Sequence, residues 1–149
     1  MTDRLDRLPE VADLVGRVPD ADLRDCAHLL AITVLSIVDI DEQVRGVLTD
    51  ALADARRRGT VAVDLRLAVG DVRNRCEHQA FAASRRADGH ARDRAFRAAR
   101  TAHCITFVIG AEGAADRTIR DNLREAVYEA AVATRGTAAV VGVLSRHAA

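Results

Sequence analysis

The sequence predicts an all-α fold, organised as a single-domain bundle of about six helices over residues 1–149. A chain of 149 residues fits one domain with a substantial core. Apolar residues make up 49% of the chain but aromatic residues only 3%, so the apolar mass consists of Ala, Val, Leu and Ile. The two prolines, Pro9 and Pro19, lie near the start, and therefore no proline interrupts a helix after residue 19.

The first two predicted helices lie before residue 39. A short amphipathic segment extends from about Leu5 to Val15 and is interrupted by Pro9. Asp20 can cap a second helix that continues to about Val38. This second helix is apolar on all sides, so we expect the hydrophobic segment near residues 20–38 to be the central, fully buried helix of the bundle. Its main stripe comprises Leu23, Cys26, Ala27, Leu30, Val34 and Ile37, with Leu29, Ile32 and Leu35 on its other sides.

The next helix has clear signals at both ends. Asp39 followed by Glu42 fits a capping box at its start. Three arginines, Arg56 to Arg58, precede Gly59, and cations in the last turn followed by a left-handed glycine are typical of a helix end. The apolar positions predicted to be buried are Val44, Val47, Leu48, Ala51, Leu52 and Ala55.

Residues 60–70 are ambiguous between helix and strand. Val61, Val63, Leu65, Leu67 and Val69 alternate strictly, which is the period of a strand. Leu65, Val69, Val72, Cys76 and Ala83 instead fit the period of a helix. Because a lone strand has no evident partner elsewhere in the chain, we favour a helix from about Asp64 to Ala87, with a candidate break at Gly70.

Three further helices complete the prediction. The first extends from about Ala91 to Ile109, and the small alanines of its packing stripe allow a neighbouring helix to approach closely. The second extends from about Ala115 to Thr134, with Gly136 as its cap, and residues 137–147 can form a last short helix.

Charge is balanced overall but uneven along the chain. All 22 basic residues are Arg, against 22 acidic residues, so no general attraction to nucleic acid or to an anionic membrane is expected. Acidic residues gather between Asp39 and Asp54, and six arginines lie between Ser84 and Arg100. We take this arginine-rich surface as the first candidate for partner binding, with the acidic helix as second choice. The candidate partner-binding residues are Arg85, Arg86, Arg94, Arg97 and Arg100.

Cysteine usage and hydropathy favour a cytoplasmic protein with free, mostly buried thiols. Cys26, Cys76 and Cys104 are widely spaced and form no CxxC pair. The first ten residues carry no apolar signal core, and the longest apolar runs fall far short of a membrane span.

The sequence offers no strong candidate for a metal-binding or catalytic site. Cys26 with His28, and Cys76 with His78, are two residues apart, so on a helix each pair diverges and is poor geometry for zinc. Glu125 and Glu129 share a face that we expect to be solvated. No nucleophile elbow, phosphate loop or dinucleotide fingerprint occurs, and no metal or cofactor is expected.

His103 is predicted to lie in an apolar seam beside Phe96, Ala99 and Phe107, where a partly buried histidine hydrogen-bonds a carbonyl group or closes a packing gap. The alternative is a small-molecule pocket, in a binding protein or an enzyme, lined by Cys76, His78, His103 and Phe107.

Three stretches of the sequence resemble one family. They read "LRDCAHLLAITVL", "ALADARRRG" and "AFAASRRADGHARDRAFRAARTAHCITFVIGAEGAAD", and they cover residues 23–116. This order resembles the all-helical immunity proteins of bacterial polymorphic toxin systems. The chain departs from the family pattern in two places. Phe81 stands where a histidine is common, and Thr106, Phe107 and Val108 replace further histidines after His103.

The resemblance implies a small cytoplasmic protein that binds and blocks a partner toxin without catalysis. It carries no agreed binding residues. We therefore predict a protein-binding module that docks through its arginine surface, with charged faces suited to fast, specific association. Tyr128 is a candidate anchor near Arg117 and Arg124, and the sequence leaves a homodimer open.

Overall fold

The computed structural model describes residues 4–110 and 118–149, and this part of the chain is helical with no strand. The all-α prediction is confirmed, with seven α-helices in the described ranges rather than about six. They are α1 (Pro9–Gly16), α2 (Leu23–Ile37), α3 (Glu42–Arg58), α4 (Val63–Arg85), α5 (Gly89–Val108), α6 (Ile119–Ala133) and α7 (Ala138–His147), with two short 3₁₀ turns, η1 (Arg4–Arg7) and η2 (Asp20–Asp22).

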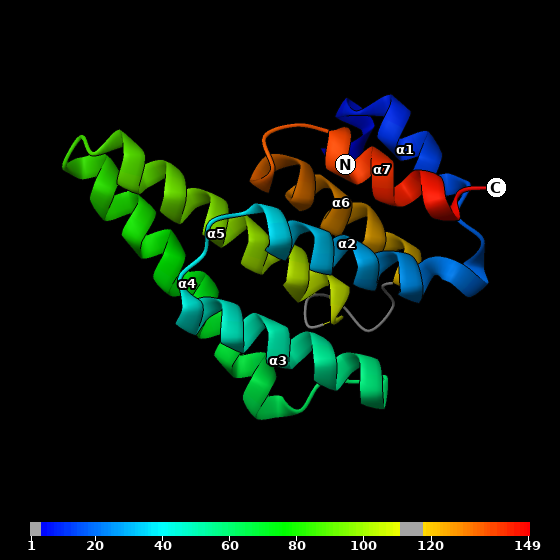
Figure 1. Ribbon diagram of the computed structural model, residues 1–149, viewed down its shortest axis with the longest axis horizontal. Coiled ribbons are helices and arrows are strands. Elements are labelled where there is room, and N and C mark those ends of the chain that lie inside the picture. The colour runs from blue at the N-terminus through cyan, green and yellow to red at the C-terminus, as the bar shows by residue number, and fades with distance from the viewer. Residues whose placement is uncertain (1–3, 111–117) are drawn as a thin grey trace.

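A long antiparallel hairpin, α4 and α5, dominates the shape of the molecule. Its tip projects beyond the other helices, on the left in Figure 1. At its other end α3 packs against α4, while α6 packs along α5. Helices α1 and α7 lie side by side at the far end of the bundle, where the backbone N–H of Ala149 donates to the carbonyl of Arg17 (2.9 Å).

The ambiguous segment is helical. Helix α4 begins at Val63 and continues through Gly70 without a break. Val69, Val72 and Cys76 follow the helical period and are buried. Val63 and Leu67 of the alternating pattern are exposed instead. The alternating apolar residues therefore do not form a strand. A helix is favoured because α5 packs along its buried face, and no strand among the described residues could pair with this segment.

Helix ends follow the predicted chemistry in part. Asp20 does not cap the second helix as predicted, because Asp20–Asp22 form the turn η2 and Asp22 takes the cap position of α2. Gly59 has φ 77° and ends α3, as predicted. The cap of α3 is Asp41, whose carboxylate accepts from the backbone N–H groups of Gln43 (2.9 Å) and Val44 (3.1 Å). The Asp39 capping box was wrong, because Asp39 lies outside the helix. The predicted start of the sixth helix, at Ala115, lies outside the described residues.

The central helix of the bundle is α5 rather than α2. Helix α5 lies between α4 and α6 and also contacts α2 and α3. Three alanines of the predicted small-residue stripe of α5, Ala98, Ala99 and Ala102, are buried. Helix α2 packs against α5, α6 and α7 but leaves Ile32 and Ile37 almost half exposed. The prediction that α2 is buried all round was therefore wrong, since none of the described helices covers that side.

Candidate functional site

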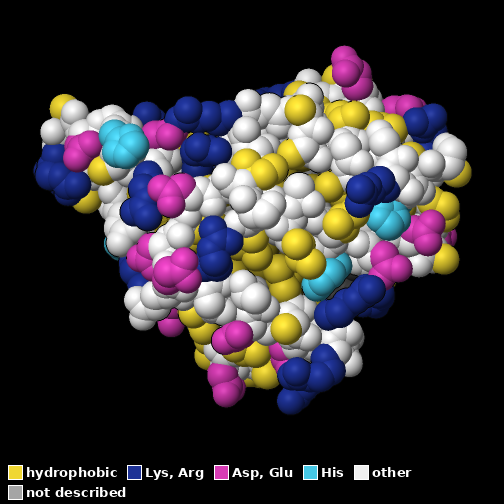
Figure 2. Space-filling model, viewed as in Figure 1, with side chains coloured by type: hydrophobic (Ala, Val, Ile, Leu, Met, Phe, Trp, Pro, Cys, Tyr) yellow, Lys and Arg dark blue, Asp and Glu magenta, His cyan; other side chains and the backbone are white. Residues whose placement is uncertain are grey.

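The structure distributes the five candidate arginines over the α4–α5 hairpin in three different environments. Arg85 and Arg86 lie at the end of α4 and are exposed, with no ion pair to any other described residue. Arg94 pairs with Asp39 (2.9 Å), and Arg97 donates to the carbonyl of Ala133 (2.7 Å). Figure 2 shows basic, acidic and histidine side chains together over the projecting arm.

The fifth arginine, Arg100, is bound to carboxylates of two helices. It contacts Glu129 (3.2 Å) and Glu77 (3.5 Å). Two of the predicted partner-binding arginines, Arg94 and Arg100, are therefore already paired with acidic residues of the same chain. The acidic helix, our second candidate for partner binding, also has a carboxylate that already binds other groups of the chain. Asp54 accepts from the backbone N–H of Ala62 (2.9 Å), and this bond, together with nearby arginines, lowers the pKa of Asp54.

The four residues of the alternative pocket lie apart. Cys76 lines a cavity between α3, α4 and α5, whereas Phe107 lines a different cavity at the end of α5. His78 is exposed, and neither it nor His103 lines either cavity. Because the four side chains share no hollow, the structure does not bring this predicted site together.

His103 is partly buried and bonds to a carboxylate rather than filling a purely apolar seam. Its Nε2 lies 2.5 Å from a carboxylate oxygen of Glu77 on α4. The hydrogen bond from His103 lowers the pKa of Glu77, with Arg100 and Arg73 acting in the same direction and partial burial opposing them. The contact between His103 and Glu77 therefore connects α4 to α5 near the middle of the hairpin.

Acidification is expected to weaken the fold partly through Glu77. Its folded-state pKa is lowered, so its contribution to stability is present above its ordinary value and disappears as the pH falls through the folded value. Urea unfolding at pH 6 and pH 3 should therefore show a smaller loss of stability for Glu77→Gln than for the original chain. Asp13→Asn, which removes an exposed carboxylate on α1, is the control. Equal acid sensitivity of the original chain and Glu77→Gln would contradict the role of Glu77.

Glu129 is the most deeply buried charged side chain of the described residues, with 1% of its surface exposed. It accepts from Arg4 of η1 (2.9 Å) and from Arg100 of α5 (3.2 Å), and Arg4 also pairs with Glu125 (2.6 Å). The prediction that Glu125 and Glu129 form a solvated face was wrong. The two carboxylates instead bind η1 to α6, with Arg100 completing the pairing of Glu129.

The three cysteines are buried and free. Burial raises the pKa of Cys26 to about 11 and raises the pKa of Cys104 above its usual range, with the Glu129 carboxylate acting in the same direction. Burial also raises the pKa of Cys76. Because the thiolate is the nucleophile, these thiols are in environments that disfavour nucleophilic chemistry.

A surface that the sequence analysis did not single out carries two phenylalanines, each beneath an arginine. Phe81 is 66% exposed and Phe96 is 40% exposed. The guanidinium of Arg85 lies 5.9 Å from the centre of the Phe81 ring, and that of Arg100 lies 5.4 Å from the Phe96 ring. We call Phe81, Arg85, Phe96 and Arg100 the Phe/Arg surface.

The two pairs of the Phe/Arg surface share one face of the hairpin. Glu77 contacts both Arg100 and His103, which places these three residues at one level. Phe81 follows Glu77 by one helical turn, and Phe96 precedes Arg100 by one turn. Because the helices are antiparallel, both steps lead toward the hairpin tip along the same face. The repeated F-x-x-x-R spacing, "FAASR" and "FRAAR", is the sequence signal that could have revealed this surface.

An aromatic–arginine contact also occurs beside the Phe/Arg surface. The guanidinium of Arg4 lies 4.5 Å from the centre of the Tyr128 ring. Arg4 and Arg100 both bind Glu129, which places Tyr128 on the α6 side of the same region. The predicted anchor Tyr128 is therefore partly covered by Arg4. The expected neighbour Arg117 lies outside the described residues.

The fold and the surface together define an all-helical protein with a projecting hairpin. Comparisons of the chain with models of known families, with curated proteins and with solved structures find no match. In residues 4–110 and 118–149, no helix is both long and apolar enough to cross a membrane. Within the same ranges, no three His, Cys, Asp or Glu side chains gather closely enough to hold a metal ion.

Proposed function

We propose that this chain is a protein-binding module that docks an acidic protein partner on the Phe/Arg surface of the α4–α5 hairpin. The observation that carries the proposal is the exposure of Phe81 and Phe96 on one face of a projecting hairpin. The chain has four aromatic residues in all, and two of them are at these exposed positions. Aromatic and arginine side chains are the residues most enriched at interface hot spots.

The arginines favour docking because they are already held in place. Arg100 is bound by Glu77 and Glu129 while its guanidinium lies over Phe96. Arg85 lies over Phe81 on the same hairpin. A side chain that is ordered before binding loses less conformational entropy when a partner arrives.

Charge indicates the chemistry of the partner. Arg85 of the Phe/Arg surface and the neighbouring Arg86 have no ion pair within the described ranges, so both are available to carboxylates. Net charge is zero, so a diffuse attraction to polyanions is not the basis of recognition. A partner with Asp or Glu beside an apolar contact patch fits both the arginines and the exposed rings.

A toxin is the specific partner that the family resemblance implies, and we retain it as part of the proposal. An immunity protein of this kind binds its toxin and blocks it, which requires a stable binding surface and no catalytic group. In the cell it would act in the cytoplasm. The buried thiols and the dispersed histidines support a binding role over a catalytic one.

Substitution of either phenylalanine is expected to weaken partner binding by about tenfold or more, because each ring would be buried at the centre of the interface. Partners are isolated from the source organism with the tagged chain, purified, and titrated by calorimetry against Phe81→Ser and Phe96→Ser. Ile32→Ser, on the uncovered side of α2, removes an apolar side chain of similar exposure away from the hairpin and is the matched control.

Two results would contradict the proposal. One is a partner that binds Phe81→Ser and Phe96→Ser as tightly as the original chain. The other is a stable homodimer in light scattering that dissociates in the same two variants, because a second copy would then cover the surface. The toxin assignment is tested separately, by measuring whether the original chain inhibits the activity of the purified partner.

A further inference from the structure

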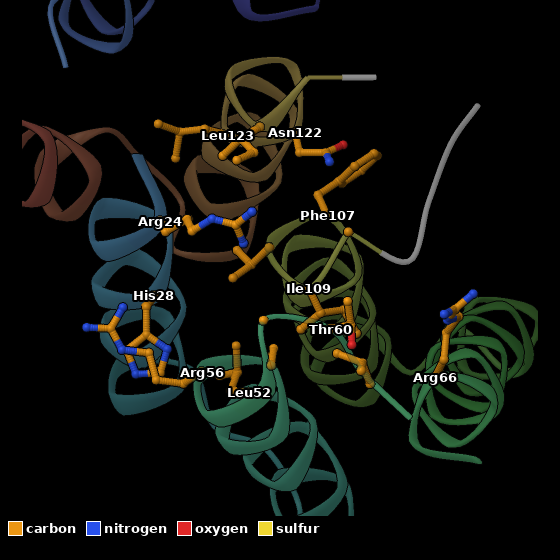
Figure 3. A pocket seen from close by; sticks show the side chains of 17 residues that line it. Arg24, His28, Leu52, Arg56, Thr60, Arg66, Phe107, Ile109, Asn122 and Leu123 are labelled. Carbon is orange, nitrogen blue, oxygen red and sulfur yellow. The ribbon is translucent and has the colours of Figure 1, made fainter. Parts of the chain in front are cut away.

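A cavity of about 330 Å³ lies where α2, α3, the end of α5 and the start of α6 meet. It is separate from the Phe/Arg surface, since none of Phe81, Arg85, Phe96 and Arg100 lines it. Figure 3 shows the side chain of Arg24 extending from α2 toward the middle of the lining residues, with Arg66 on the opposite side and Arg56 beside His28.

Among the described residues that line it, the cavity carries three arginines and no carboxylate. Arg56 pairs with Asp25, which lies outside the lining. The side chains of Arg24 and Arg66 form no ion pair or hydrogen bond with any residue that the structure describes. Burial and the nearby Arg56 guanidinium lower the pKa of His28, so the arginines supply the positive charge.

A second cavity does not share this imbalance. This cavity, of about 560 Å³ between α3, α4 and α5, is lined by Asp39 and Asp41 as well as by Arg86 and Arg94. There Asp39 and Arg94 already pair with each other (2.9 Å). Since the whole chain has zero net charge, the first cavity does not simply share a general excess of arginine.

The remaining lining of the first cavity is largely apolar. It includes Ala27, Leu52, Val61, Ile109 and Leu123. Leu52, Val61 and Leu123 belong to the buried core, so these side chains form a floor, whereas Arg24, Arg56 and Arg66 are exposed and form the rim. An apolar floor beneath a ring of guanidinium groups is complementary to a molecule with a short hydrocarbon body and an anionic end.

We propose that this cavity binds a small organic anion, whose carboxylate or phosphate group pairs with Arg24 and whose apolar body rests on Leu52 and Val61. The guanidinium fork matches both head groups, because each offers two oxygens to parallel N–H donors. The inference does not depend on the docking proposal. It assigns the molecule a ligand site on helices α2, α3, α5 and α6.

The test compares three probes with the same six-carbon body, namely hexanoate, hexyl phosphate and the neutral 1-hexanol, titrated by calorimetry. At least one anion is expected to bind tenfold or more tighter than 1-hexanol, and the tighter anion identifies the preferred head group. Arg24→Gln should weaken that anion about tenfold and leave 1-hexanol unchanged. The ring resonances of His28 should shift on binding, while those of the exposed His78 should not.

Two variants control for binding elsewhere. Arg92→Gln removes an exposed arginine of α5 that has no ion pair within residues 4–110 and 118–149. Phe81→Ser removes the most exposed ring of the Phe/Arg surface. Anion affinity should be unchanged in both variants. Equal affinity for 1-hexanol and the anions, an equal loss in Arg92→Gln and Arg24→Gln, a loss in Phe81→Ser, or no binding of any probe would overturn the proposal.

Discussion

Replacing Glu129 by alanine is expected to lower the free energy of unfolding by about 3 kcal/mol or more. The reason is that two arginines would lose the carboxylate that they share. Arg100 would lose its buried carboxylate partner on α6, and its Nε already has no hydrogen-bond partner among the described residues. Arg4 would keep Glu125 as its ion-pair partner, so the attachment of η1 to α6 would weaken as well. Among the described carboxylates, Arg100 would keep only the longer contact with Glu77, and a partly buried arginine that loses its main carboxylate costs more than a solvated one.

The measurement is urea unfolding at neutral pH, followed by circular dichroism. Glu125→Ala is the matched control, because Glu125 lies one turn away on α6 and pairs only with Arg4 among the described residues. Its side chain is more exposed, so a loss of about 1 kcal/mol or less is expected. If Glu129→Ala were no more destabilising than Glu125→Ala, the buried network would not support the fold in the way described.

Ile105→Ala on α5 is expected to cost about 2–5 kcal/mol of stability, whereas the same substitution at Ile32 on α2 should change it by about 0.5 kcal/mol or less. Ile105 is fully buried, so truncation leaves a cavity among packed helices. Ile32 is 47% exposed, and alanine is the better helix former, which offsets part of the lost contact. The chemical change is identical, so the difference reports burial alone.

The pair of isoleucine variants tests which helix is central. Unfolding is measured by denaturant titration for both variants and the original chain under the same conditions. Similar losses at both positions would mean that α2 is covered on the side that the structure leaves open, as its all-round apolar sequence had suggested. A large loss at Ile105 alone supports α5 as the core of the bundle.

The sequence alone could predict only part of the Phe/Arg surface. The run of arginines from Ser84 to Arg100 lies on the hairpin, and Arg85 and Arg86 are exposed there. Arg94 and Arg100 belonged to the same run but pair with Asp39 and Glu129. Those acids are far away in the chain, so no local pattern could identify the pairing. The F-x-x-x-R spacing was visible, but whether the rings face solvent depends on which side of the hairpin α3 and α6 cover.

By itself the sequence determined the all-α fold class and which segments form most of the helices. The absence of proline after residue 19, the helical spacing of apolar residues and the glycine at position 59 are local signals, and each acts within a few turns of the chain. Only the tertiary structure decided the exposed side of α2, the burial of Glu129 and the separation of Cys76 from Phe107. These depend on contacts between distant segments, such as Arg4 with Glu129, which are 125 residues apart. Helix formation is governed by neighbours in the chain, whereas burial is governed by neighbours in space.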